Sequence, residues 1–226
     1  MTANEFFHFS HVLAFAVVMA VDLPAFYAVR LATATGANAD MKLMAARIAR
    51  WANALSSAAV ALLLPLGVAI AIEIGVYTLT DPAYLTATWI IGLGWFALII
   101  VAEASGGGLG ERLYTIEIWV RALIGLGNIY DAVVGFMGTG MIQTHWLATK
   151  VLLLGLILLA SAWARAKLRP VRTALKALNP MSAIAGKFDE PTALAVTAAL
   201  GRVRPAIHAT WLMLLIAAWM GINKSF

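Results

Sequence analysis

The sequence contains no cysteine and few charged residues. None of its 226 residues is Cys, and only 12% are Asp, Glu, Lys or Arg. The missing cysteine excludes disulfides, thiolate metal sites, cysteine-ligated iron–sulfur clusters and a cysteine nucleophile. An average soluble domain is roughly a quarter charged. This composition therefore argues against a soluble enzyme.

Apolar residues instead run from one end of the chain to the other. They make up 62% of the sequence, and the mean hydropathy is +0.88. A membrane span needs about 20 mostly apolar residues. We therefore predict an all-α, polytopic transmembrane helix bundle that forms a single domain over residues 1–226. The predicted spans cover roughly 9–31, 47–74, 86–104, 113–141, 145–165 and 205–222, with a cytoplasmic connection over 166–204.

The basic residues predict the orientation. If all six spans form, 13 of the 16 Lys and Arg fall on one side, while Lys224 lies on the other and Arg121 and Lys150 fall inside spans. By the positive-inside rule both termini then face out. Without the fourth span the basic loops would lie on opposite sides. We therefore retain that span although it contains Glu117, Arg121 and Asp131.

The motifs give little support for a phosphate-binding loop or for a nucleic-acid partner. The glycine-rich "GGGLGER" at 106–112 lacks the Gly-Lys-Ser/Thr of a phosphate loop and is interpreted as a turn. The basic residues flank spans and are not interleaved with aromatic side chains, so no nucleic-acid partner is predicted. Small residues in the fourth span predict close packing against its neighbours: Gly125, Gly127, Gly135, Gly138 and Gly140.

The first span, "EFFHFSHVLAFAVVMAVDLPAFY", carries polar residues in an apolar setting. A mid-bilayer charge costs about 2.5–3.5 kcal/mol, so such groups face the bundle interior. Asp22 lies on nearly the same helix face as His8 and His11, about 16 Å deeper. We predict that Asp22 pairs with Arg121 or Lys150. The alternative is a carboxylate at the inner end of a shorter span, in contact with cytoplasmic water.

Further polar groups gather at the predicted outer surface. The fifth span begins with His145 at the expected depth of His11, and Lys150 follows about one and a half turns deeper. Met137 and Met141 end the predicted fourth span on the same side. We predict that the imidazoles of His11 and His145 face one cavity. An interfacial role for the histidines is the alternative.

The remaining intramembrane groups favour structural roles. Arg121 and Asp131 are ten residues apart, too far to pair with each other, so each is expected to form an ion pair with another span. His208 lies near the inner end of the sixth span, where packing, hydrogen bonding and a site role remain open.

"HWLATKVLLLGLILLASAWARAKLRP" resembles two related families of small bacterial membrane proteins. In the CopD copper-resistance family a Lys precedes an aliphatic helix that closes with Arg-x-x-Leu-x-Pro, here Lys150 and then Arg165, Leu168 and Pro170. HemJ-type protoporphyrinogen oxidases have a Trp-x-x-x-Lys element, here Trp146 and Lys150. The first span, with His11 and then Leu23-Pro24, and the second, opening "ARIARWANALSSAAVALLLPLG", are also similar to theirs. HemJ-type proteins are shorter, with four spans, and Ala148 stands where a histidine is expected.

The HemJ resemblance implies haem b and a redox role between the quinone pool and a partner or substrate. His11, His145 and His8 are then the candidate haem ligands. Lys150 and Arg121 would compensate the negative charge of the haem propionates or of a quinone oxygen. It implies a multi-pass protein of the bacterial inner membrane whose partners are the lipid bilayer, quinone, a periplasmic or membrane redox protein, or a second copy.

The CopD resemblance implies copper transport or resistance instead. Histidine and methionine suit copper, and the candidate ligands are His8, His11, His145, Met137 and Met141. No Met-x-x-Met cluster or His-rich tail accompanies them, so we favour haem. A third reading is a membrane anchor subunit of a larger enzyme. Whether the chain is itself an oxidoreductase, or a subunit of one, is left open.

Overall fold

The computed structural model describes residues 3–32, 34, 39–78, 81–105, 107–177 and 190–222. This part of the chain is almost entirely helical and contains no regular strand, so the predicted all-α class is confirmed. The helices are α1 (Ala3–Ala32), α2 (Ala39–Glu73), α3 (Pro82–Ala104), α4 (Gly107–Phe136), α5 (His145–Lys167), α6 (Arg169–Ala177) and α7 (Glu190–Ile222).

Six of these helices are long and apolar enough to cross a membrane, and α6, with nine residues, is too short. Large apolar side chains remain exposed along them, among them Val12, Ile90, Leu123, Leu126, Leu212 and Ile222. In water such surfaces would be unfavourable. The exposed side chains therefore identify a multi-pass membrane protein in contact with lipid.

Two predicted spans differ in extent from the corresponding helices. The fourth span was placed at 113–141, but α4 runs from Gly107 to Phe136, so Met137 and Met141 follow the helix instead of ending it. The sixth was expected to begin at 205, but α7 begins at Glu190 and continues through Pro205. Within the connection predicted over 166–204, residues 169–177 and 190–204 are helical. The acidic entry and Pro191 of "DEPTALAVTAAL" predict a helix start, and α7 begins there, at Glu190.

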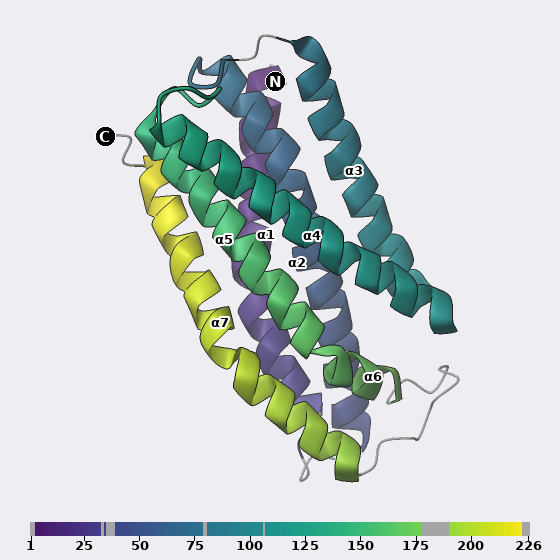
Figure 1. Ribbon diagram of the computed structural model, residues 1–226. Helices are drawn as coiled ribbons and strands as arrows, with labels where there is room; N and C mark the ends of the chain where they lie inside the picture. Colours follow the sequence, from purple (N-terminus) through teal and green to yellow (C-terminus); the bar gives the residue numbers. More distant parts are fainter. Residues whose placement is uncertain are drawn as a thin grey trace.

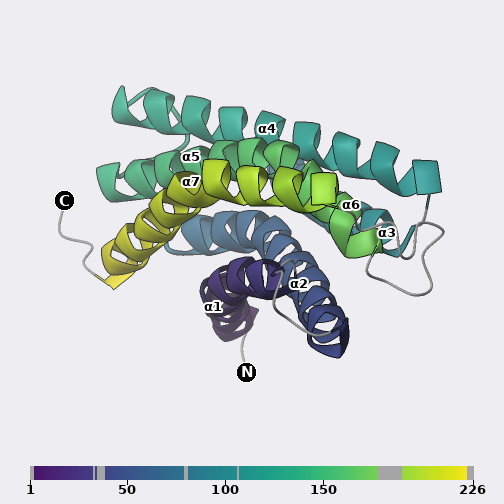
Figure 2. The same cartoon turned by 90° about the horizontal axis from the view of Figure 1, so that it is seen from below.

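The helices form two groups that α3 joins (Figures 1 and 2). The hairpin of α1 and α2 is one group, and α4, α5 and α7 form the other. Helix α3 packs on α2 and on α4. The α1–α2 hairpin makes few close backbone contacts with α5 and α7, and a cavity lined by these four helices lies between the two groups.

The membrane-spanning helices run in alternating directions, as the six predicted spans require. Helix α1 begins and α7 ends at the same end of the bundle, whereas α6 lies at the opposite end (Figure 1). The end of α1, the start of α2, the end of α3 and the start of α4 lie at the end with α6, so the basic residues near these helix ends share one side. That this side is cytoplasmic, with both termini outside, stays a prediction. Lys187 and Lys224 lie outside the described residues.

At the end of the bundle that holds the termini, two backbone hydrogen bonds join the α2–α3 connection to the α4–α5 connection. The Thr78 N–H donates to the Met141 carbonyl at 2.8 Å, and the Gln143 N–H donates to the Val76 carbonyl at 2.9 Å. Between them Tyr77 is buried, and its hydroxyl lies 3.1 Å from that of Tyr84. Burial raises the pKa of the Tyr77 phenol above its usual range, so this hydroxyl stays neutral.

Candidate functional site

The half of the bundle nearer α6 contains an alternating row of charges, which we name the charge chain. Its consecutive ion-pair distances are 2.7, 2.8, 4.0, 2.6, 3.3 and 2.5 Å. The members come from α3, α4, α5 and α6 and follow one another as Arg121, Glu117, Arg165, Glu103, Arg172, Glu111 and Lys176.

Glu117 is the centre of the buried part of this chain. Its side chain has no exposed surface, and its Oε1 accepts hydrogen bonds from Nε and Nη2 of Arg121 at 2.9 and 2.7 Å. The indole N–H of Trp95 donates to the same oxygen at 3.3 Å. Nε of Arg165 lies 2.8 Å from Oε2, an ion-pair contact without hydrogen-bond angles. One carboxylate thus serves two guanidinium groups from two helices.

Aromatic rings and polar side chains complete the surroundings of the guanidinium groups. Arg121 lies over the ring of Trp95 at 5.2 Å, and Arg165 and Arg172 lie over Tyr114 at 4.7 and 4.2 Å. Such cation–π contacts are strongest when they are desolvated. The Tyr114 hydroxyl also donates to the Arg165 carbonyl at 3.1 Å, which ties α4 to the last turn of α5.

Three further hydrogen bonds connect the arginines of the charge chain to side chains of α2 and α5. Nη1 of Arg165 donates to Asn53 Oδ1 at 3.3 Å and to Ser57 Oγ at 3.0 Å, which joins α5 to α2. Nη1 of Arg121 donates to Ser161 Oγ at 3.0 Å. Arg165 therefore connects the two helix groups.

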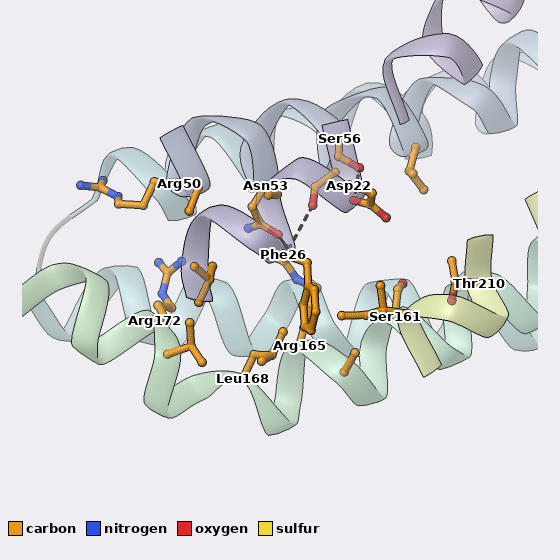
Figure 3. Close-up of a pocket in the computed structure, with 18 of the residues that line it drawn as sticks. Asp22, Phe26, Arg50, Asn53, Ser56, Ser161, Arg165, Leu168, Arg172 and Thr210 are labelled. Carbon is orange, nitrogen blue, oxygen red and sulfur yellow. Dashed lines mark hydrogen bonds between the residues drawn. The ribbon is translucent and has the colours of Figure 1, made fainter. Parts of the chain in front are cut away.

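A cavity of about 170 Å³ lies between the two groups beside the charge chain. Figure 3 shows Asp22, Ser56, Asn53, Ser161 and Arg165 around this space, with Arg50 at one end of the view and Thr210 at the other. The wall between these polar groups is apolar and includes Val18, Ala25, Phe26, Ile157, Ile207 and Leu214. The cavity is thus amphipathic and lies within the membrane-spanning helices.

Asp22 faces this interior cavity, but the predicted ion pair is absent. In the described part of the chain no cation lies within the 4 Å of an ion pair to Asp22. Its Oδ1 accepts a 2.6 Å hydrogen bond from Ser56, while Arg121 and Arg165 act on it electrostatically. Helix α1 continues ten residues beyond Asp22, to Ala32, and the alternative of a shorter membrane span that ends near Asp22 stays a prediction. Arg121 was expected to pair with another span, but Glu117, one turn earlier on its own helix, is its partner.

His11 lies in the half of the bundle nearer the termini, against α2. Its imidazole Cε1 approaches the position that a Cβ on Gly67 would occupy to 3.3 Å. Its Nδ1 is buried without a hydrogen-bond partner. Lys150 acts on it electrostatically and lies with Nζ 5.8 Å from the Trp146 ring centroid and beside Gly221 of α7. His11 and Lys150 are thus brought into one region by α1 and α5.

The other predicted outer residues are more dispersed. His145 opens α5 and is exposed, with its ring 6.0 Å from that of Phe136. Met137 is 70% exposed, whereas Met141 packs against the core near Tyr77. Neither His11 nor His145 lines the 170 Å³ cavity. Both lie toward the end of the bundle that holds the termini, but a shared cavity for their imidazoles stays a prediction.

Asp131 and His208 occupy separate places. Asp131 is half-buried and lines a second cavity of about 410 Å³ together with Tyr77, Tyr130 and Gln143. No ion pair of Asp131 is found within the described residues. His208 is exposed, and its Nδ1 lies 2.7 Å from the Arg204 carbonyl of its own helix. This is the hydrogen-bonding role that the sequence left open.

Sequence reasoning missed most of the charge chain. Glu117 was noted only as an obstacle to the fourth span, and Arg165 only as part of a motif. The spacing of Glu117 and Arg121 could have revealed their pairing, because residues four apart share a helix face. The partners from α3 and α6 had no such local signal.

Neither a metal site in the part of the chain that the structure describes nor a family assignment was found. Among the described residues, no group of three or more His, Asp or Glu side chains gathers as a metal site. Comparison of the chain with known protein families, with curated proteins and with solved structures found no match.

Proposed function

We propose that the protein is a haem-b-binding integral membrane redox protein in which His11 is an axial ligand. The observation that carries this proposal is the buried His11 imidazole, whose Nδ1 has no hydrogen-bond partner. Buried polar atoms are normally satisfied, and imidazole is a suitable axial ligand for haem iron. The resemblance to HemJ-type proteins, which includes His11, points to the same group. Bound haem would supply one-electron chemistry.

The residues around His11 fit the requirements of such a ligand. Gly67 leaves room for the ring against α2, since a Cβ there would lie 3.3 Å from Cε1 of His11. The Lys150 ammonium lies in the same region and would compensate a propionate. His145 remains a candidate second ligand. Quinone, a redox protein or a second copy of the chain would be the electron partner, in the bacterial inner membrane.

Absorption spectroscopy of the purified protein tests this proposal. We expect a Soret band in protein purified from cells supplied with a haem precursor, and we expect His11→Ala to remove most of it. His208→Ala is the matched control, because that imidazole is exposed and bonds only to its own helix. A His11→Ala protein that keeps its full haem content would overturn the ligand assignment.

Other outcomes of the same preparation would refute haem altogether. A colourless protein that binds copper through His8, His11 or His145 would support copper transport instead. A colourless protein that binds neither, and that co-purifies with a larger enzyme, would support the anchor-subunit interpretation.

A further inference from the structure

We propose that Asp22 is a proton-binding site that the cavity connects to the end of the bundle bearing α6. The site takes up and releases a proton at the Asp22 carboxyl group, in the middle of the membrane. This inference does not depend on the identity of any cofactor.

The first support is the position of Asp22. It lies ten residues before the end of α1, which places it about 15 Å from that end of the helix at 1.5 Å per residue. A carboxylate at this depth is normally paired or neutral. Here its direct partner is a neutral hydroxyl, Ser56, at 2.6 Å. Asp22 therefore lacks the ion pair that would keep it permanently ionised.

The second support is the charge of its surroundings. The charge chain contains four cations and three carboxylates, a net charge of +1. Glu117 already contacts Arg121 and Arg165 directly, so Asp22 senses both from a distance. An ionised Asp22 makes the whole cluster neutral, and a protonated one leaves it at +1. Burial favours the acid, whereas the Ser56 hydroxyl and the two guanidinium groups favour the carboxylate.

The third support is a route for the proton between Asp22 and the end of the bundle that bears α6. The same cavity that Asp22 faces also contacts Arg50 and Lys176, whose side chains are partly exposed at the end of the bundle. Hydroxyl and amide groups capable of holding water line the path. The polar and charged groups around Asp22 come from every helix that borders the cavity: Arg50, Asn53, Ser56 and Ser57 of α2, Glu103 of α3, Tyr114 and Arg121 of α4, Ser161 and Arg165 of α5, Arg172 and Lys176 of α6, and Thr210 of α7.

Infrared titration of the full-length protein in lipid nanodiscs tests the proton site. We expect the C=O band of a protonated carboxylic acid to appear as the pH falls and to be absent from Asp22→Asn. In Ser56→Ala the band should remain but appear at higher pH, because the hydroxyl that stabilises the carboxylate is gone. If Asp22→Asn leaves every carboxylic-acid band unchanged, Asp22 is a fixed counter-charge and the proposal is wrong. An unshifted band in Ser56→Ala would likewise overturn it.

Carbodiimide labelling in proteoliposomes tests the side of access. Because the chain has no cysteine, a single Thr173→Cys on the exposed face of α6 reports orientation through an impermeant thiol reagent. Carbodiimides attack protonated carboxyl groups, so labelling of Asp22, detected by mass spectrometry, should follow the pH on the α6 side only. Labelling that follows the pH on the side of the termini would refute the route.

Discussion

Glu117→Gln is expected to destabilise the protein by about 3–5 kcal/mol, as removal of one partner from a buried ion pair does. Glu117 is fully buried and contacts both Arg121 and Arg165. The substitution keeps the shape of the side chain but raises the net charge of the charge chain from +1 to +2. Both guanidinium groups are almost fully buried, with side chains 4% and 8% exposed, so bulk water compensates little of this change. The loss should appear as a lower midpoint of thermal unfolding in detergent.

Two variants separate this electrostatic effect from packing. Glu111→Gln makes the same chemical change on the same helix, but its side chain is 47% exposed, so we expect a loss within about 1 kcal/mol. The double variant Glu117→Gln with Arg121→Gln returns the net charge to +1 and should recover part of the stability. If the double variant is less stable than Glu117→Gln alone, charge imbalance is not the cause.

Gly155→Leu is expected to separate α5 from α4 and to lower stability by about 1–3 kcal/mol, the usual cost of overpacking. A Cβ on Gly155 would lie 2.7 Å from the Gly125 carbonyl oxygen and 2.7 Å from Cγ1 of Ile129. The first of these atoms is backbone and cannot move without shifting α4. Gly155→Ala should cause a smaller loss of the same kind.

Gly127→Leu is the matched control for this prediction. A Cβ on Gly127 would meet nothing within 4 Å, so the same substitution on α4 should leave the unfolding midpoint nearly unchanged. Equal losses for Gly155→Leu and Gly127→Leu would show that bilayer or expression effects, and not the α4–α5 contact, limit stability. Of the glycines for which the sequence predicted close packing, Gly125 and Gly135 meet residues of α5, whereas Gly127 and Gly138 meet nothing within 4 Å.

The existence of the spans could be predicted from the sequence because it depends on local properties. About 20 apolar residues specify a membrane-crossing helix wherever they stand in a chain, and all six predicted spans correspond to helices long and apolar enough to cross. The helix boundaries could not be predicted in the same way, since the end of a hydrophobic run does not mark the end of a helix. Helix α7 shows this, because its first turns at Glu190 precede the span predicted from 205.

The pairing of the buried charges was decided only by the tertiary structure. The sequence predicted that Asp22 faces the interior, and it does, because a mid-membrane carboxylate must avoid lipid. Its partner depends on which helix lies opposite, and Glu117 competes for the same arginines from a better position. Glu117 reaches Arg121 within its own helix and Arg165 across the α4–α5 contact. Asp22 on α1 is left across the cavity with a serine, because ion pairs require contact distances that only helix packing determines.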